Sequence, residues 1–234
     1  MCVVALALNQ HPDWPIIMIG NRDEFHARVS APLHAWNDGS GIIAGRDLVG
    51  GGTWLGVQPA LTRLVVVTNV RSGAAPDGGK ASRGVLVTDM LADSGTFADP
   101  APAMLNAFNG FSLLSVAGDT VQLFTNRPAP MVRALGAGVH ALANEAEGSA
   151  CPRAARLGAV LASWVTEATD TPESLFTALQ AKDAPALFLC SPVYGTRCST
   201  LVAINRDGGG QIIERRYDKG GILAEETALE FQFG

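Results

Sequence analysis

Short apolar runs, separated by clusters of turn-forming residues, predict most of the secondary structure of this chain. Residues 2–8 and 16–20 are apolar and flank the polar segment 9–13, which is the pattern of a β-hairpin. Residues 64–68 form the plainest buried strand, and it ends at Asn69. The remaining predicted strands are 42–45, 53–57, 111–117, 120–125, 139–143, 199–205 and 211–217.

Other segments have the apolar spacing of helices. Residues 152–168 place Leu157, Leu161 and Trp164 on one face, with Pro152 near the start of the segment. Ser82 precedes an apolar face in residues 82–92 and is a residue type that caps helices. Further helices are predicted over 101–108 and 172–181.

The order of these elements predicts the fold class. Strands and helices alternate in groups, and the strands are joined by hairpins rather than by regular βαβ units. This order favours an α+β fold in which mainly antiparallel sheets carry helices on their outer faces. We find no repeat, low-complexity segment or linker, so the sequence predicts a single domain over residues 1–234.

Composition narrows the function classes. Of the 234 residues, 47% are hydrophobic and 17% are charged, and the formal net charge is -5. No apolar run approaches the roughly 18 residues of a membrane-spanning helix, so we expect no transmembrane segment. An acidic chain without a basic cluster argues against a nucleic-acid partner. The absence of a signal-peptide pattern predicts a cytoplasmic location with reduced thiols, while the oligomeric state stays open.

Cys2 is the first candidate for chemistry. The four cysteines, at positions 2, 151, 190 and 198, form no Cys-x-x-Cys pair, which argues against a zinc or redox motif. Removal of Met1 would leave the Cys2 thiol beside its own α-amine, which can act as the general base for that nucleophile. The alternative is that Cys2 is an apolar strand residue, because cysteine packs as a small hydrophobe.

A polar cluster follows the apolar run 16–20. It reads Asn21-Arg22-Asp23-Glu24, and pairing with residues 2–8 would bring it back to Cys2. Arg22 near the thiol would favour the thiolate, and Asp23 would orient the α-amine. The alternative is a solvated turn.

Further candidates lie at the ends of predicted strands. Asn69 and Asn144 each follow an apolar run, and an asparagine amide can donate to a developing oxyanion. Arg197 follows Tyr194-Gly195-Thr196. The glycine-rich segment 50–56 lacks the Lys-Ser/Thr of a phosphate loop, and its Trp54 is suited to form a pocket wall.

Several of these motifs together resemble a known family. The motifs are Met1-Cys2, Asn21-Arg22-Asp23-Glu24-Phe25, Ala44-Gly45-Arg46-Asp47, Gly51-Gly52-Thr53-Trp54-Leu55-Gly56-Val57, Thr68-Asn69-Val70-Arg71, Ser82-Arg83-Gly84, Gly110-Phe111-Ser112-Leu113-Leu114 and Tyr194-Gly195-Thr196-Arg197. In this order they resemble the NRDE family, the family of transport and Golgi organisation protein 2, up to about residue 217. The resemblance implies the four-layer αββα sandwich of the N-terminal nucleophile hydrolases. Family members commonly read Trp-Pro-Lys where this chain has Cys151-Pro152-Arg153.

The resemblance also implies roles for individual residues. By comparison with choloylglycine hydrolases and penicillin V acylases, Cys2 resembles the nucleophile, Arg22 and Asp23 the pair beside it, and Asn144 the oxyanion donor. Asn69 and Arg197 match further catalytic positions. We expect the ligand pocket to include Asn21, Glu24, Thr53 and Trp54.

Three functions remain open. The first is a cysteine amidohydrolase that cleaves non-peptide C–N bonds in a small amide or acyl compound, without a cofactor or metal. The second is a protein that binds or traffics haem, or handles acyl-CoA or lipid, in the same pocket, as the resemblance implies. Its candidate iron ligands are His11, His26, His34, His140, Cys2 and Cys151. The third is an inactive scaffold that serves as an interaction module.

Overall fold

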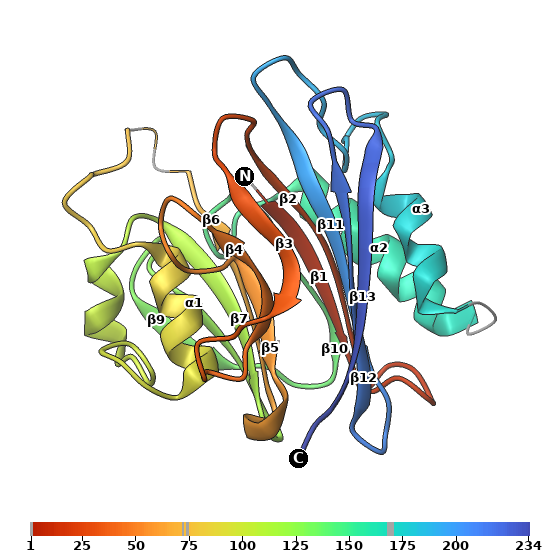
Figure 1. Cartoon of the computed structure of the whole chain (residues 1–234), viewed down its shortest axis with the longest axis horizontal. Coiled ribbons are helices and arrows are strands. Elements are labelled where there is room, and N and C mark those ends of the chain that lie inside the picture. Colours follow the sequence, from red (N-terminus) through yellow and green to blue (C-terminus); the bar gives the residue numbers. More distant parts are fainter. Residues whose placement is uncertain (1, 72, 74, 168–170) are drawn as a thin grey trace. The chain divides into compact units, whose positions relative to one another are not determined.

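The computed structural model describes residues 2–71, 73, 75–167 and 171–234 (Figure 1). The chain forms two compact units. The first unit comprises Met1–Arg28, Gly136–Ala143 and Cys151–Gln232, and the second comprises Val29–Leu135, Asn144–Ala150 and Phe233–Gly234. The chain therefore passes more than once from one unit to the other, and the single domain remains a prediction.

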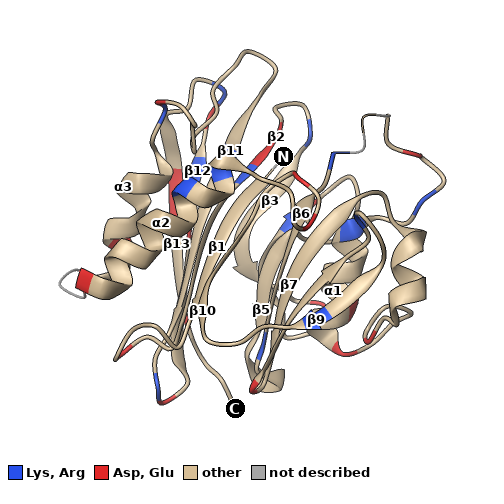
Figure 2. Ribbon diagram, turned by 180° about the vertical axis from the view of Figure 1, so that it is seen from behind, with Lys and Arg blue, Asp and Glu red and all other residues tan. Residues whose placement is uncertain are grey.

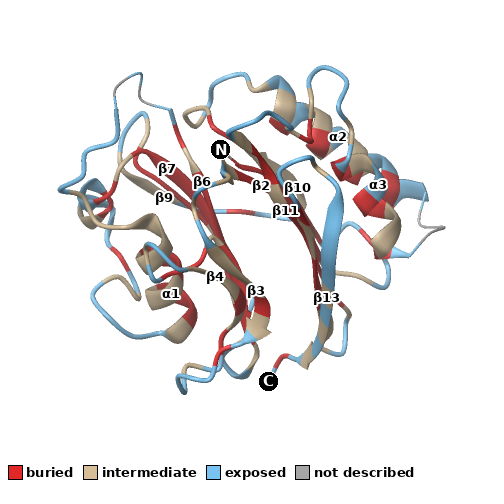
Figure 3. Cartoon of the chain, turned by 45° about the horizontal axis from the view of Figure 1, so that its top comes forward, coloured by how far each residue is buried: buried red, intermediate tan, exposed pale blue. Residues whose placement is uncertain are grey.

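The first unit contains a six-stranded sheet in the order β10-β1-β2-β11-β12-β13, with antiparallel pairing throughout. Its strands are β1 (Cys2–Leu8), β2 (Ile16–Phe25), β10 (Gly138–Leu142), β11 (Tyr194–Ile204), β12 (Gly209–Tyr217) and β13 (Leu223–Gln232). One face of the sheet packs against α2 (Pro152–Glu167) and α3 (Leu175–Leu179), which follows the short 3-10 helix Pro172–Ser174. Figure 3 shows the buried residues of α2 and α3 on the side that faces this sheet.

The core between sheet and helices explains why these segments fold as they do. Leu157 and Leu161 of α2 are fully buried, and they pack in one cluster with Val3, Ala5 and Ile19 of the sheet. Burying each leucine contributes roughly 1.5–3 kcal/mol. The predicted helix 152–168 is confirmed up to Glu167, and Ala168 lies outside the described residues.

The second strand continues beyond its apolar run, which the sequence pattern ended at residue 20. β2 runs to Phe25 because β11 pairs with it along its whole length, from Ile16 to Phe25. Backbone hydrogen bonds to β11 thus hold the polar segment in the sheet. Because side chains alternate along a strand, Asn21 and Asp23 point toward the helices and Arg22 points to the opposite face. The alternative of a solvated turn is therefore wrong.

The second unit contains a seven-stranded sheet whose strands follow chain order from β3 to β9, again with antiparallel pairing. They are β3 (Ser30–Ala35), β4 (Ile43–Asp47), β5 (Leu55–Gln58), β6 (Arg63–Asn69), β7 (Phe111–Ala117), β8 (Thr120–Thr125) and β9 (Met131–Ala134). The helix α1 (Arg83–Ala92) and the 3-10 helices Pro59–Leu61 and Pro102–Ala107 complete this unit.

The core of the second unit lies between its sheet and α1. Leu86 and Leu91 of α1 are fully buried in one cluster with Val65 and Phe111 of the sheet. The Ser82 hydroxyl accepts a hydrogen bond from the Gly84 N–H at 3.3 Å, which confirms the predicted cap. The α+β class with mainly antiparallel sheets and flanking helices is confirmed. Among the described residues, no helix is both long and apolar enough to cross a membrane.

Three strands were missed in the sequence, namely β3, β9 and β13. β13 is an edge strand whose first four residues are exposed and whose later residues alternate between half-buried and exposed, so it lacks the apolar run by which the other strands were found. The helix predicted over 101–108 is a 3-10 helix, Pro102–Ala107.

Gly20 provides a test of the packing around β2. A Cβ atom at this position would lie 2.6 Å from Val4 Cγ1 and 2.7 Å from the Val3 carbonyl oxygen. We expect Gly20→Ala to lower the free energy of unfolding by about 1–3 kcal/mol, because an overpacked core must rearrange. Urea denaturation measures this change. Gly136→Ala is the control, since nothing lies within 4 Å of its Cβ, and it should stay within about 0.5 kcal/mol of the parent. Equal stability of the two variants would contradict this account.

Candidate active site at the end of the first sheet

Cys2 lies directly opposite Arg22 in the pairing of β1 with β2. Both side chains are on the face of the sheet away from α2 and α3, because the intervening residue Val3 packs in the core with those helices. Cys2 is 6% exposed and Arg22 is 8% exposed. The backbone of Asp23 hydrogen-bonds to the Cys2 thiol. The structure thus brings a buried thiol and a buried guanidinium side by side.

The protonation state of Cys2 follows from this environment. Burial raises the pKa of the thiol, and the charge of Asp23 raises it further. The Arg22 guanidinium lowers the pKa, as we expected from the sequence, but burial outweighs it. Cys2 is therefore a neutral thiol at pH 7, and it needs a base before it can act as a nucleophile.

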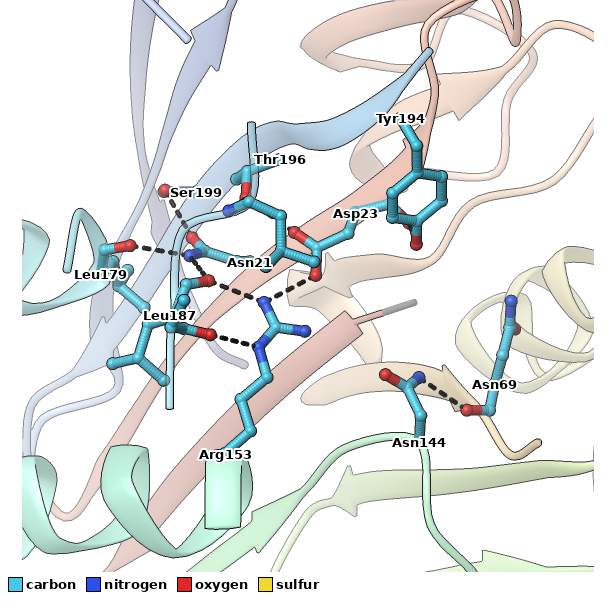
Figure 4. A network of polar contacts seen from close by, with 12 residues as sticks. Asn21, Asp23, Asn69, Asn144, Arg153, Leu179, Leu187, Tyr194, Thr196 and Ser199 are labelled. Atoms are coloured by element: carbon cyan, nitrogen blue, oxygen red, sulfur yellow. Dashed lines mark hydrogen bonds and ion pairs between the residues drawn. The ribbon is translucent and has the colours of Figure 1, made fainter. Parts of the chain in front are cut away.

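Asp23 points the other way, toward the helices. Its carboxylate accepts a hydrogen bond from the Thr196 hydroxyl at 2.7 Å and forms an ion pair with the Arg153 guanidinium at 2.6 Å (Figure 4). Asp23 is 1% exposed, and burial raises its pKa while the charge of Arg153 and the bond from Thr196 lower it. The Tyr194 hydroxyl donates to the Asp23 carbonyl oxygen at 2.9 Å.

Arg153 was not singled out as a site residue in the sequence. Besides its ion pair with Asp23, it donates to the carbonyl oxygens of Ala186 and Leu187 at 2.8 and 2.6 Å. The available signal was the tripeptide Cys151-Pro152-Arg153, where family members commonly have lysine at the third position. Arginine and lysine are both cations, and in this chain the cation on the first turn of α2 pairs with Asp23.

Asn21 belongs to the same helix-facing network. Its amide nitrogen donates to the carbonyl oxygens of Leu179 and Leu187 at 2.8 and 2.9 Å, and its oxygen accepts from the Ser199 hydroxyl (Figure 4). Asn21 is fully buried, so these bonds satisfy its amide within the protein. The network fastens the segment after α3 to the sheet, and a pocket role for Asn21 stays a prediction.

Arg197 and Glu24 lie near Arg22. Arg197 is the extra residue of a bulge in β11, between Thr196 and Cys198, and its Nη1 lies 3.0 Å from His26 Nδ1. Burial and the neighbouring charges of Arg216 and Arg22 lower the pKa of Arg197. A Glu24 carboxylate oxygen lies 3.9 Å from an Arg22 nitrogen.

The remaining predicted residues belong to the second unit. The Asn144 side chain donates to the Asn69 carbonyl oxygen at 2.8 Å, and the Asn144 carbonyl accepts from the Arg71 N–H at 2.9 Å. The Thr53 hydroxyl donates to the Leu55 carbonyl oxygen at 2.9 Å, and Trp54 packs against the core of this unit. The predicted catalytic set is thus divided between the units. The oxyanion role of Asn144 and the pocket roles stay predictions.

The predicted iron ligands show no common site. His26, His34 and His140 each have a ring nitrogen within hydrogen-bond distance of a carbonyl oxygen. His11 accepts from two backbone N–H groups and stacks on Trp164 at 5.0 Å. Cys151 is half-buried beside the core of the first unit. No group of three or more histidine, cysteine or acidic residues able to hold a metal ion occurs in the described part of the chain. Haem binding stays a prediction of the resemblance.

Comparison with known proteins decides the family. A family model described as Transport and Golgi organisation 2 matches residues 1–219. The chain belongs to this family. The resemblance seen in its motifs is therefore confirmed.

The chain is also similar to individual relatives and, distantly, to a solved structure. Transport and Golgi organization protein 2 homologs of Bos taurus and Homo sapiens are each 26% identical over 258 residues, covering 92% of this chain and 92% of the relative. A Mus musculus homolog is 29% identical over 160 residues, which is 62% of this chain and 57% of the relative. The solved structure of Anbu from Hyphomicrobium sp. strain MC1 aligns with a TM-score of 0.32 and 11% identity, over 97% of this chain and 87% of that one. A TM-score this low carries no argument about fold or activity.

The ion pair between Asp23 and Arg153 gives a stability prediction. We expect Arg153→Met to lower the free energy of unfolding by about 3–5 kcal/mol, because it leaves a buried carboxylate without its partner. Chemical denaturation followed by circular dichroism measures the change. Arg156→Met is the matched control one turn further along α2, where the partner Asp183 is exposed. A surface pair of this kind contributes about 0–1 kcal/mol. A loss below 1 kcal/mol for Arg153→Met would show that the buried pair is dispensable.

The buried thiol of Cys198 is expected to make the free energy of unfolding depend on pH. It is buried opposite Arg22 on β11, and burial together with the neighbouring Glu214 raises the pKa of its thiol well above the usual value. In the unfolded chain the thiol loses its proton above about pH 8.5, whereas in the folded chain it keeps it. The unfolded state then binds fewer protons, so the free energy of unfolding falls as the pH rises.

We therefore expect Cys198→Ala to make this decline shallower. Between pH 9 and 10.5 the slope should decrease by up to about 1.4 kcal/mol per pH unit, which is the contribution of one thiol. Urea denaturation at a series of pH values measures the slope. A comparison at pH 7 isolates the effect of removing the sulfur atom from the core. An unchanged slope would mean that the Cys198 thiol ionises equally in both states.

Proposed function

We propose that this protein is a cysteine amidohydrolase of the N-terminal nucleophile type, acting on a small amide or acyl compound. The observation that carries the proposal is the buried thiol of Cys2 opposite Arg22, at the second position of the chain. Membership of the Transport and Golgi organisation 2 family is consistent with it. In this proposal Met1 is removed and Cys2 becomes the first residue.

The new α-amine supplies the base that the buried thiol needs. An α-amine has a pKa of about 7.7–8.0, so a substantial fraction is neutral at pH 7 to 8. It takes the proton from the Cys2 thiol, and the sulfur attacks the carbonyl carbon of the substrate. The C–N bond then breaks, and the leaving amine takes the proton from the α-ammonium group. Water hydrolyses the thioester in a second step, which releases the acid and restores the thiol.

Arg22 has a positioning and electrostatic role in this scheme. Its guanidinium already lowers the pKa of the Cys2 thiol, so it stabilises the thiolate as the proton leaves. Asp23 contributes its backbone, which hydrogen-bonds to the sulfur, while its carboxylate is engaged with Arg153 and Thr196. The oxyanion donor expected from the family comparison is Asn144.

Replacement of Cys2 tests the proposal. With a panel of acyl p-nitroanilides from acetyl to octanoyl, we expect turnover that Cys2→Ala reduces by at least on the order of 10³-fold, because the nucleophile is lost. Release of p-nitroaniline measures turnover, and intact-mass analysis should show loss of Met1 and an acyl adduct on Cys2. Cys190→Ala, which removes an exposed thiol, is the control and should retain parental turnover.

Two outcomes would contradict the proposal. Full turnover by Cys2→Ala would exclude Cys2 as the nucleophile, and active protein that retains Met1 would exclude the α-amine as its base. If the parent turns over none of the panel but shows a saturable absorbance change with haem at micromolar protein, ligand binding without hydrolysis would replace this proposal.

A further inference from the structure

A row of cysteine and arginine side chains crosses four neighbouring strands of the first sheet. In register order it consists of Cys2 on β1, Arg22 on β2, Cys198 on β11 and Arg216 on β12. Paired residues share a face, so all four side chains lie on the face away from the helices. Figure 2 shows the basic stretches of β11 and β12 next to the charged end of β2.

Arg197 adds a third guanidinium to this row. It occupies the bulge next to Cys198, and the charges of Arg216 and Arg22 both act on it. Arg197 and Arg216 are half-buried, whereas Arg22 is buried, so the group reaches from the interior to the solvent. The like charges of Arg216 and Arg22 disfavour the charged form of Arg197, and an anion bound between the three would offset this repulsion.

Two nitrogens of this group are buried without a hydrogen-bond partner. Across the described residues, Arg22 Nη1 and Arg197 Nε have no acceptor within hydrogen-bond distance. An unsatisfied buried donor destabilises the folded protein, and a charged donor does so more strongly. Two such donors on neighbouring guanidinium groups indicate a place prepared for an acceptor from outside the chain.

Within the described part of the chain, no carboxylate reaches Arg22 Nη1 or Arg197 Nε. Glu24 lies 3.9 Å from Arg22, beyond hydrogen-bond distance. Glu214, two residue pairs further along β12, hydrogen-bonds with the Cys198 thiol. Guanidinium forks match the oxygens of carboxylate and phosphate groups, so either anion would satisfy the free donors.

We propose that Arg22, Arg197 and Arg216 form an anion subsite beside Cys2, and that the acyl compound processed here carries a carboxylate or phosphate group. The link to turnover rests on the proposed function, but binding of the anion does not. Arg216 is the specificity residue that neither the motifs nor the family comparison indicated. The row leads from Cys2 on β1 to Arg216 on β12. In this proposal the anionic group of the substrate binds among the arginines, and the scissile carbonyl lies at the Cys2 sulfur.

Binding to the Cys2→Ala protein tests the subsite without any turnover. The carboxylate probe is hexanoate, and hexanamide is its uncharged counterpart. The phosphate probe is inorganic phosphate, and sodium chloride at equal ionic strength is its control. Isothermal titration calorimetry should give a Kd for hexanoate about tenfold or more below that for hexanamide, which is the effect of one charge-assisted hydrogen bond. Tighter binding of hexanoate than of phosphate would identify the anionic group of the substrate as a carboxylate, and the reverse would identify it as a phosphate.

Arg215→Gln is the matched control for Arg216→Gln. Arg215 is the adjacent residue of β12 but faces the helices, where its guanidinium stacks on Phe176 at 4.2 Å and pairs with Glu226. We expect Arg216→Gln and Arg197→Gln to remove most of the preference for the anion, and Arg215→Gln to preserve it. If an arginine variant does not fold, the comparison of hexanoate with hexanamide on Cys2→Ala protein that keeps all its arginines still decides whether an anion is preferred.

The outcomes separate the two proposals. Equal affinity for hexanoate and hexanamide, with no gain from phosphate, would overturn the anion subsite even if p-nitroanilides are hydrolysed. A preference that survives in Arg197→Gln and Arg216→Gln would overturn the assignment to these residues. If the preference is lost in them, and the parent with Cys2 intact turns over none of the p-nitroanilides, the amidohydrolase is rejected and the subsite is retained.

Discussion

The buried ion pair between Asp23 and Arg153 is the contact on which the arrangement of the first unit depends. It joins the polar end of β2 to the first turn of α2 at 2.6 Å, with the Asp23 side chain fully buried and the Arg153 side chain 14% exposed. The same arginine reaches the carbonyl oxygen of Leu187, which also accepts from Asn21. The start of α2 and the segment around Leu187, which are far from β2 in the sequence, are thereby fixed against the strand that carries Arg22. A buried charge is tolerated in this position because each partner has the other and further hydrogen bonds.

The alternation of side chains along β2 divides one polar motif into two functions. Asn21 and Asp23 face the helices and hold the unit together, whereas Arg22 faces the other way, beside Cys2 and Cys198. Because the helix-facing members are bound within the protein, their hold on the strand keeps Arg22 in place, while Arg22 Nη1 has no acceptor among the described residues. This gives a rigid support for the Cys2 thiol and for the unsatisfied Arg22 Nη1.

Much of the fold could be predicted from apolar runs. β1, β6 and α2 were predicted because each buries a continuous or periodic apolar surface, which leaves a clear pattern. The polar half of β2 and the whole of β13 were not predicted, because pairing with a neighbouring strand holds them in the sheet. Such pairing uses backbone groups, which every sequence possesses, and so it leaves little trace in the pattern of side chains.

The sequence by itself determined the family, the α+β class, and the nearness of Cys2 to Arg22, since a hairpin between the first two apolar runs fixes that register. Only the tertiary structure decided what surrounds this pair. Arg153 meets Asp23, and Arg216 joins the row of Arg22, through segments far apart in the chain. Long-range pairing of this kind depends on how strands and helices are ordered in space, which no local spacing of residues encodes.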